Sequence, residues 1–510
     1  AQGVYTIVDF HQGFPDWLLP MLEPIKRDCG GVLPEVAKLI GECRAFASFN
    51  YTTDPATGFP RTQDCLSLGF DQYDRSPEVA SAWGNFFAYE SAQQKVQDFW
   101  RVVATALAGS AGVLAYDLVN EPLAGNFFAD PDLLIPGHAD LHLLQPMYAR
   151  LHDVIRAVDP GGIMMYEPAP VPDSLPAWLP VAGGVHSSGF TAGPAGAAMS
   201  YHIYSCGFAL AACDKRGDPA SSDCDVCDKF ATTAVTKRQE EVTKLGGAAF
   251  LTEFGACSGS ETCIAEINRI ADRADSALHS WAYWQFKYYH DITTVAGPEE
   301  GFYHADGSLQ DGKVAALSRT YAPIIAGRPE LVRYDAKTGA FHLRLSTDAG
   351  TDHLPTEIYL NRKMNYPGQG FVVHALNATV EDQGDGPLLV TALARVPAGL
   401  QVDVVVTRPY SGPTSGTFAA ASKDAIKWQV EESSSPGFGL SVSEKSKGWR
   451  ALKVFSDDGK LICALETSKG GTVAQHCSLE GKDRHGFLFQ YYVEIWKAGV
   501  LSIPVLLLLY

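Results

Sequence analysis

Up to about residue 325, the chain alternates short apolar runs with longer amphipathic stretches. The runs are continuously apolar, which is typical of strands that are buried on both faces. Helix-like stretches lie between them, at residues 93–108, 141–158 and 235–245. The pattern therefore predicts a parallel sheet covered by helices on both faces. The six runs lie at residues 4–8, 113–116, 163–166, 199–201, 248–251 and 281–284.

A polar or acidic residue follows each of these runs at once. This placement is typical of a (β/α)₈ barrel, whose chemistry lies at the carboxyl ends of its strands. A doubly wound open sheet would also accept six strands. A barrel of eight strands cannot close with six without exposing two sheet edges. The barrel interpretation therefore implies that two strands before Ala1 are missing or are supplied in another way.

The texture of the sequence changes after Pro329. Short segments at residues 340–345, 356–360 and 402–406 alternate polar with apolar side chains, and turn residues separate them. This is the pattern of a β-sandwich. Glu431–Gly437 has the composition of a linker, and strand-like segments follow it. We expect three parts: a catalytic barrel over 1–327, a β-sandwich over 328–430 and a β-rich extension of unknown role over 431–510.

The net charge of -18 excludes a nucleic-acid partner, because no basic surplus is present to neutralise phosphates. It leaves peripheral contact with a membrane open, since an apolar surface can engage lipid without positive charge. The apolar tail Val500–Tyr510 is too short to span a bilayer. A buried terminal strand is favoured there over the remnant of an anchoring signal.

The cysteines and two glycosylation sequons, at Asn50 and Asn377, favour an oxidising compartment with some disulfides. The chain has 11 cysteines, so at least one is left without a partner in the same chain. A zinc site at Cys224 and Cys227 is disfavoured, because no second Cys-x-x-Cys or paired His motif lies nearby. No signal peptide opens the sequence. The closely spaced pairs are Cys206 and Cys213, Cys224 and Cys227, Cys257 and Cys263, and Cys463 and Cys477, the last a candidate bridge.

Two glutamates end apolar runs in a way that suits glycoside hydrolysis. Glu121 lies between Asn120 and Pro122, and the proline stops further strand pairing, so that the glutamate emerges at the rim of the sheet. Glu253 also ends a run, and Gly255 permits a sharp turn after it. Hydrolysis with retention needs two carboxyl groups about 5–5.5 Å apart, one to donate a proton and one to attack.

The order of these motifs resembles glycoside hydrolase family 5, and within it the endoglycoceramidases, which cut the β-glucosyl bond between oligosaccharide and ceramide. The likeness covers Gly3 to about Pro409. It implies a secreted or lysosomal retaining endo-β-glycosidase that acts on glycosphingolipids without a metal or organic cofactor. Further segments that carry the likeness are Asp9–Gln12, Arg61–Asp64, Ala82–Phe86, Trp281–Tyr289, Gly301–Tyr303 and Leu317–Ala322.

The resemblance also implies a role for several side chains. Glu121 would be the general acid/base, with a pKa raised by Glu253, and Glu253 the nucleophile. Asn120 would hydrogen-bond the sugar 2-hydroxyl. Tyr204 would hold Glu253 through its hydroxyl, and His202 would line the same cleft.

Three more side chains would bind or flank the sugar. His11 would bind hydroxyls of the sugar nearest the cut, Trp284 would form the apolar floor beneath it, and Trp83 would flank the site. Each side chain could instead have a purely structural role. An aromatic residue in such a strand can belong to the core, and a histidine at a strand end can simply be hydrogen-bonded within the fold.

The chain departs from the family pattern in two ways. Gly13 stands where the family has a sugar-binding Asp, and the first two barrel strands, with an Arg near the nucleophile, do not occur. Two alternatives therefore stay open. The protein could be another family 5 enzyme that acts on a soluble β-glucoside or polysaccharide, or a catalytically impaired glycolipid-binding homologue. The preferred glycan and the oligomeric state are not indicated.

Overall fold

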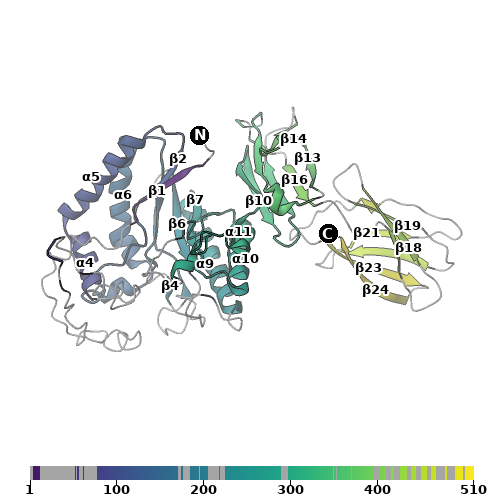
Figure 1. Cartoon of the computed structure of the whole chain (residues 1–510), viewed down its shortest axis with the longest axis horizontal. Coiled ribbons are helices and arrows are strands. Elements are labelled where there is room, and N and C mark those ends of the chain that lie inside the picture. Colours follow the sequence, from purple (N-terminus) through teal and green to yellow (C-terminus); the bar gives the residue numbers. More distant parts are fainter. Residues whose placement is uncertain are drawn as a thin grey trace. The chain divides into compact units, whose positions relative to one another are not determined.

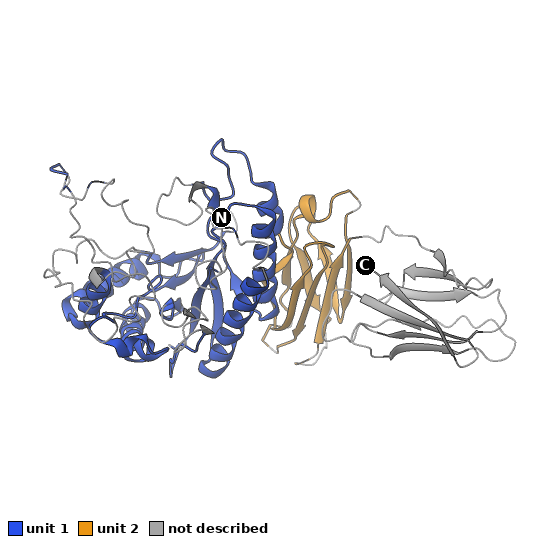
Figure 2. Cartoon of the chain, turned by 90° about the horizontal axis from the view of Figure 1, so that it is seen from below, with its two compact units in different colours: residues 1–317 blue, residues 318–510 orange. Residues whose placement is uncertain are grey.

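The computed structural model divides into two compact units, Ala1–Leu317 and Ser318–Tyr510 (Figure 2). From residue 415 on, only the backbone of the strands is described. Before that, the described residues are 4–11, 52, 54–56, 61, 77–170, 174–175, 184–193, 196–204, 218, 224–288, 297–348, 350–351, 353–368, 370–393, 399 and 401–408.

A six-stranded parallel sheet forms the centre of unit 1 (Figure 1). The strand order is β1-β2-β3-β6-β7-β8, and every neighbouring pair is parallel. The six apolar runs thus form strands in the order expected. Because all strands point the same way, their carboxyl ends meet at one edge of the sheet. The strands are β1 (Thr6–Asp9), β2 (Val113–Asp117), β3 (Ile163–Tyr166), β6 (Ala197–Ile203), β7 (Ala248–Phe254) and β8 (Ser280–Trp281).

Amphipathic helices connect these strands and cover the sheet. In α5, Val96, Trp100 and Ala104 recur every four residues and are all buried, so this stripe faces the sheet. The indole Nε1 of Trp100 donates to the carbonyl of Leu118 at 3.0 Å, which ties the helix to the chain just after β2. The helices are α4 (Pro77–Ala88), α5 (Glu90–Leu107), α6 (Gln145–Arg156), α9 (Cys224–Leu245), α10 (Glu261–Ser276) and α11 (Asp311–Leu317).

Shorter elements complete unit 1. They are the helical turns η2 (Pro131–Leu134), η3 (Asp140–Leu144) and η5 (Gly297–Glu300), and the hairpin of β4 (Ser174–Leu175) and β5 (Gly184–Val185).

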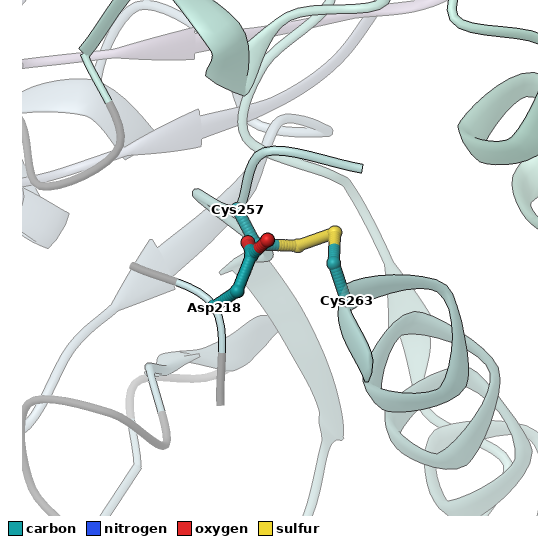
Figure 3. Close-up of side chains that lie close together, drawn as sticks. All are labelled: Asp218, Cys257 and Cys263. Carbon is teal, nitrogen blue, oxygen red and sulfur yellow. A yellow bond between two sulfur atoms is a disulfide. The ribbon is translucent and has the colours of Figure 1, made fainter. Parts of the chain in front are cut away.

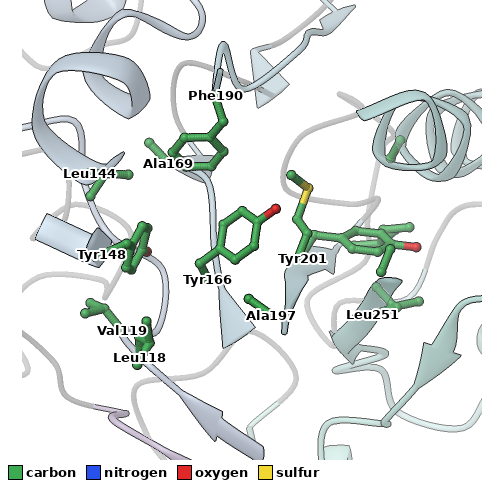
Figure 4. Packing of buried hydrophobic residues seen from close by; sticks show 14 of the residues in the cluster. Leu118, Val119, Leu144, Tyr148, Tyr166, Ala169, Phe190, Ala197, Tyr201 and Leu251 are labelled. Carbon is green, nitrogen blue, oxygen red and sulfur yellow. The ribbon is translucent and has the colours of Figure 1, made fainter. Parts of the chain in front are cut away.

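Buried aromatic and aliphatic side chains from the strands and helices form the core of unit 1 (Figure 4). Tyr166 lies at the end of β3, and its ring centroid is 5.4 Å from that of Phe190 and 6.1 Å from that of Tyr148. Burying a side chain of this size stabilises the fold by about 2 kcal/mol. This packing fixes the strand ends from which the polar side chains of the site project.

Unit 2 begins with a β-sandwich, as the sequence predicts. Its antiparallel sheets have the orders β10-β11-β16-β13 and β14-β15-β12-β9. In β11, Phe341, Leu343 and Leu345 are buried while their neighbours are partly exposed, so one face of the strand points to the core. The strands are β9 (Tyr321–Ile324), β10 (Arg328–Tyr334), β11 (Phe341–Ser346), β12 (Thr356–Tyr359), β13 (Val372–Leu376), β14 (Ala378–Asp382), β15 (Leu388–Ala392) and β16 (Gln401–Thr407), with the short helix α12 (Arg362–Asn365).

The last part of unit 2 contains two more antiparallel sheets, of orders β17-β18-β19-β22 and β21-β20-β23-β24. Glu431 and Glu432, which we expected in a linker, lie in β18. The apolar tail forms β24 and pairs with β23, in agreement with the strand prediction. The strands are β17 (Ser415–Phe418), β18 (Ile426–Glu432), β19 (Phe438–Ser443), β20 (Trp449–Phe455), β21 (Leu461–Glu466), β22 (Cys477–Ser478), β23 (Phe489–Lys497) and β24 (Val500–Leu509).

Some sequence predictions concern side chains that lie outside the described residues. Cys463 lies in β21 and Cys477 in β22, but their side chains are outside the described part, as are Gly13, Cys206 and Cys213. Among the helices that the structure describes, none combines the length and the apolar character needed to cross a membrane.

Candidate active site

Polar side chains from five neighbouring strands converge at the carboxyl edge of the sheet in unit 1. The register of β6 against β7 places His202 beside Glu253, and that of β1 against β2 places Asp9 beside Asp117. The converging side chains are His11 after β1, Glu121 after β2, Glu167 after β3, His202 and Tyr204 at the end of β6, and Glu253 in β7.

Glu121 and Glu253 lie close enough to act on one bond. A carboxylate oxygen of each, together with a ring nitrogen of His202, falls within a set of atoms no more than 4.8 Å apart. The side chain of Glu253 is 12% exposed and that of Glu121 34% exposed, so Glu121 is the more open to solvent. The separation suits the retaining arrangement of two carboxyl groups about 5–5.5 Å apart.

One hydrogen bond and one longer polar contact flank the carboxylate of Glu253. The hydroxyl of Tyr204 donates to its Oε2 at 2.7 Å. On the other side, Nδ1 of His11 lies 3.6 Å from Oε1 of Glu253 and 2.8 Å from Oδ2 of Asp9. Both oxygens of Glu253 thus have a polar neighbour, and Tyr204 lies in the position expected for it.

His202 is buried among three carboxyl groups. Its Nδ1 lies 2.7 Å from Oε1 of Glu121, 3.6 Å from Oε2 of Glu253 and 3.7 Å from Oε1 of Glu167. Burial lowers the pKa of His202, but the charges of Glu167 and Glu253 and the hydrogen bond with Glu121 more than offset this, so the pKa is raised well above 6.5. This shift favours the protonated imidazole, which can share a proton with Glu121 along their 2.7 Å contact.

The pKa of Glu121 is shifted in the direction opposite to our expectation. Burial raises this pKa. The hydrogen bond from His202 and the charges of His202 and His11 lower it by more than burial raises it, so the pKa of Glu121 is below 4.5. The pKa of Glu253 is raised instead, by burial and then by the charge of Glu121, although His202 and the Tyr204 hydroxyl act against this. Sequence reasoning missed the effect because it did not place an imidazolium against Glu121.

Trp284 provides a half-buried aromatic surface next to these groups. Its ring stacks on the imidazole of His11, with ring centroids 5.1 Å apart and planes inclined by 7°. Its Nε1 donates to Oε2 of the buried Glu300 at 3.0 Å, which fixes the plane of the indole. The backbone of Trp284 forms a parallel bridge with Gly255, two residues after Glu253. Trp284 thus lies beside the site, and its role as a sugar platform stays a prediction.

Asn120 and Trp83 have different surroundings. Asn120 is partly exposed, and its backbone N–H donates to the carbonyl of Phe10 at 3.2 Å, which joins the segments after β2 and β1. Trp83 lies in α4, is 6% exposed and packs against Phe86 and Phe87 with ring centroids 5.6 and 5.8 Å away. Trp83 is thus part of the core of unit 1, and sugar binding by either residue stays a prediction.

Three acidic residues of the site were not singled out from the sequence. Glu167 and Asp117 follow or end apolar runs, so the rule that a polar residue follows each run contained a signal for both. Asp117 is buried, and burial, followed by the charge of Asp9, raises its pKa to about 7. Glu300 ends η5, 16 residues after Trp284, and the sequence has no pattern that joins the two.

Among the described residues, three clusters have the ligand types and spacing to hold a metal ion. Two of them share Glu253, one with Asp9 and His11 and the other with Glu121 and His202, so they are the side chains already described. In both, the histidine nitrogen is occupied by a carboxylate partner, which suits proton sharing as well as metal binding.

The third cluster consists of Asp218, Cys257 and Cys263 (Figure 3). The two cysteines form a disulfide, so their sulfurs are not available as the thiolates that bind zinc. Asp218 accepts hydrogen bonds from the backbone N–H and the hydroxyl of Ser258. The disulfide and these hydrogen bonds hold the loop that follows β7, so the cluster has a structural role. Of the other candidate zinc ligands, Cys227 is buried in α9, and the side chain of Cys224 is outside the described part.

Two family models match the chain. The model described as "Cellulase (glycosyl hydrolase family 5)" matches residues 79–290, which include Glu121 and Glu253. The model described as "Glycoside hydrolase family 5 C-terminal domain" matches residues 319–406, which form the β-sandwich.

Curated relatives point the same way. An endoglycoceramidase of Cyanea nozakii is 25% identical over 422 residues, which are 78% of this chain and 74% of the relative. An endoglycoceramidase of Hydra vulgaris is 26% identical over 392 residues, which are 72% of this chain and 63% of the relative.

Solved structures of endo-glycoceramidase II from Rhodococcus sp. share the fold. Its complex with a cellobiose-like isofagomine is 23% identical, with a TM-score of 0.52, and covers 71% of this chain and 72% of that one. Its complex with ganglioside GM3 is 24% identical, with a TM-score of 0.50 and the same coverage.

Proposed function

Because the chain belongs to glycoside hydrolase family 5, we propose that it is a retaining endo-β-glycosidase that cleaves the β-glucosyl linkage between oligosaccharide and ceramide in glycosphingolipids. One observation carries the mechanism: carboxylate oxygens of Glu121, which follows β2, and of Glu253, which lies in β7, come within 4.8 Å of each other. The substrate class is supported by the relatives of Cyanea nozakii and Hydra vulgaris, both of them endoglycoceramidases.

In the first step, the ionised Glu253 attacks the anomeric carbon while the bond to the ceramide oxygen breaks. Glu121 donates a proton to that oxygen, so ceramide leaves as an alcohol and a glycosyl-enzyme forms. The proton reaches Glu121 from His202 along their 2.7 Å hydrogen bond. Storage of this proton on His202 explains how a glutamate with a lowered pKa can serve as an acid.

In the second step, Glu121 acts as a base. It removes a proton from a water molecule, whose oxygen attacks the anomeric carbon and releases the oligosaccharide from Glu253. Tyr204 and His11 hold the carboxylate of Glu253 through both steps, Asn120 binds the 2-hydroxyl, and the stacked rings of Trp284 and His11 support the sugar.

An apolar surface near the cut suits the lipid part of such a substrate. The side chain of Phe286, two residues after Trp284, is 63% exposed. Its ring packs against Phe302 and Tyr303, with centroids 5.4 and 5.7 Å away. In our proposal this aromatic group contacts the ceramide chains or the lipid surface, so that Phe286→Ser raises KM for a glycolipid but not for a soluble lactoside.

The test is incubation of the protein with a ganglioside that carries a fluorescent ceramide, with products identified by mass spectrometry. Release of intact oligosaccharide and fluorescent ceramide is expected. Hydrolysis confined to soluble β-glucosides or polysaccharide would favour a different family 5 activity. Binding without any hydrolysis would favour an impaired glycolipid-binding homologue.

Two variants connect this activity to the named residues. Glu253→Ala is expected to lower turnover at least about 10⁴-fold, because the covalent step is lost. Glu121→Ala is expected to form glycosyl azide from an activated aryl lactoside when sodium azide is added, since azide needs no base. Glycosyl azide of β configuration supports retention with Glu121 as acid/base. If Glu253→Ala keeps its activity and Glu121→Ala forms no glycosyl azide, the assignment of both residues is excluded.

We also propose that the protein acts in an oxidising compartment, secreted or lysosomal. The disulfide between Cys257 and Cys263 supports this, because the cytosol keeps most thiols reduced. Alkylation of the protein from its native cells, without a reducing agent, tests the proposal by mass spectrometry. Alkylated Cys257 and Cys263 would contradict it.

A further inference from the structure

Glu167 is a buried carboxyl group that contacts the backbone of Glu121. It follows β3 without a gap, and only 2% of it is exposed. The hydroxyl of Tyr148 donates to its backbone carbonyl at 2.7 Å, and Tyr148 itself is buried in the core of unit 1. The position of Glu167 is therefore fixed by the sheet and by the core. A carboxyl group enclosed in this way needs a partner to offset its desolvation.

That partner is the backbone of Glu121. Oε2 of Glu167 accepts the N–H of Glu121 at 2.7 Å. Glu121 has a φ of 41°, in the left-handed region that residues with a side chain rarely adopt. Its N–H has left the ladder of β2, which ends at Asp117. The bond to Glu167 thus satisfies this amide and holds it in an unfavourable backbone conformation.

Glu167 also faces the partner of the Glu121 side chain. Its Oε1 lies 3.7 Å from Nδ1 of His202, the same nitrogen that lies 2.7 Å from Oε1 of Glu121. The two oxygens of Glu167 therefore face the main chain of Glu121 on one side and its proton-sharing partner on the other.

We propose that Glu167 is a positioning residue that fixes Glu121 for proton transfer by accepting its backbone N–H. The proposal rests on the proposed role of Glu121 as general acid/base. Loss of the acceptor lets the backbone at Glu121 relax from its left-handed conformation and moves the carboxyl group away from the leaving oxygen. Proton donation then suffers, while attack by Glu253 does not depend on this contact.

The experiment compares two substrates that differ in their need for an acid. A glycosphingolipid has an alkoxide leaving group that must be protonated, whereas 2,4-dinitrophenyl β-lactoside has a leaving group that departs without a proton. Glu167→Leu removes the acceptor and keeps the space filled. We expect it to lower kcat/KM on the glycolipid at least about 100-fold and on the aryl lactoside less than about tenfold.

Glu167→Gln keeps an acceptor oxygen and is expected to restore kcat/KM to within about fivefold of the wild type on both substrates. Equal losses on the two substrates in Glu167→Leu, no loss at all, or a glutamine variant as impaired as the leucine variant would each overturn the proposal. If Glu167→Leu does not fold, Glu167→Ala is measured in its place, with the same outcomes.

Two further variants keep the results distinct. Glu241 in α9 is another buried carboxylate that accepts a backbone N–H, that of Ser188, so Glu241→Leu is a matched control and is expected to affect both substrates equally. Glu121→Gln is expected to lose the glycolipid activity and to retain attack on the aryl lactoside. If Glu121→Gln still cleaves the glycolipid, the proposed function fails, whatever Glu167 does.

Discussion

At the scale of single residues, the site is organised around one shared proton. Nδ1 of His202 lies within 3.7 Å of oxygens from Glu121, Glu253 and Glu167. Its charge lowers the pKa of all three carboxyl groups against the effect of burial. Burial and the neighbouring carboxyl groups still leave the pKa of Glu167 well above 4.5 and that of Glu253 raised, so His202 offsets only part of the cost of placing these groups together.

The Tyr204 hydroxyl controls the ionisation of Glu253. Its hydrogen bond lowers the pKa of that carboxyl, which burial raises. In Tyr204→Phe the pKa of Glu253 therefore rises further, and the acidic limb of the profile of kcat/KM against pH moves to higher pH. We also expect kcat/KM at the optimum to fall roughly tenfold. An acidic limb at the wild-type position would show that Tyr204 does not hold the ionised nucleophile.

His279 makes the stability of unit 1 depend on pH. The Tyr201 hydroxyl donates to its Nδ1 at 2.7 Å, and its Nε2 donates to Gln239 at 2.8 Å, so the neutral ring is satisfied. Burial lowers the pKa of His279 from 6.5 to about 4. Between these pH values the unfolded chain binds more protons than the folded one, so the free energy of unfolding decreases as pH falls from 6.5 to about 4.

The full decrease is on the order of 3 kcal/mol. Urea unfolding of the wild type at several pH values across this window measures it. The variant His279→Gln removes the titrating group and is expected to have a shallower dependence on pH. Parallel curves for the two proteins would contradict the assignment to His279.

Sequence reasoning could find those site residues that end strands within recognisable motifs. Asn120-Glu121-Pro122 and Thr252-Glu253-Phe254-Gly255 indicate two glutamates at strand ends, and the parallel sheet brings such ends together. Glu167 carries only the signal of a polar residue after an apolar run and Glu300 carries none, because their importance lies in contacts with Glu121 and Trp284 that only the fold creates. The same holds for the lowered pKa of Glu121.

At the scale of elements, the turn after β7 depends on the absence of a side chain. Gly255 has a φ of 116°, and a Cβ built there would lie 2.1 Å from the ring of Tyr283. Gly246, after α9, also has a positive φ, of 82°, but a Cβ there would meet nothing within 4 Å. The two glycines therefore separate the effect of backbone conformation from that of steric overlap.

Gly246→Ala is expected to lower the free energy of unfolding by about 1–2 kcal/mol, the cost of a left-handed conformation in a residue with a Cβ. Gly255→Ala adds the overlap with Tyr283 and is expected to cost several kcal/mol more and to displace Glu253. Urea unfolding and kcat/KM of both variants provide the check. A Gly255→Ala protein as stable and active as Gly246→Ala would show that the loop accommodates the methyl group.

The elements themselves were predictable where their pattern was strong. All six apolar runs lie in or at the ends of strands, and residues 93–108, 141–158 and 235–245 overlap α5, α6 and α9. The first eleven residues of α9, residues 224–234, were missed, although Cys227, Ala231 and Ala234 are buried at helical spacing. Glu431 and Glu432 were expected in a linker because they are charged, yet β18 pairs with neighbours on both sides through its backbone.

At the scale of the whole molecule, net charge becomes important for the proposed substrate. The chain carries a formal charge of -18 at pH 7, and a ganglioside with sialic acid is also negative. Repulsion between them is screened as ionic strength rises, because the Debye length falls from about 30 Å at 0.01 M to about 8 Å at 0.15 M. Association with an anionic glycolipid is therefore expected to improve with salt.

We expect kcat/KM for a sialylated glycolipid in non-ionic micelles to rise several-fold between these salt concentrations. A neutral glycolipid with the same ceramide, measured in the same micelles, is the control and is expected to change little. An equal response of the two substrates would show that salt acts on the micelle or on the protein fold. If cationic side chains near the site attract the sialic acid instead, kcat/KM of the sialylated substrate alone would fall as the salt concentration rises.

The junction between β7 and β8 has a mechanical consequence. The N–H of Trp284 donates to the carbonyl of Phe254 at 2.9 Å, and the N–H of Ala256 donates to the carbonyl of Trp284 at 3.1 Å. Because these two bonds couple the segment of Glu253 to that of Trp284, we expect the spacing between the proposed nucleophile and the proposed sugar platform to vary less than the distance of either from Glu121, which follows a different strand.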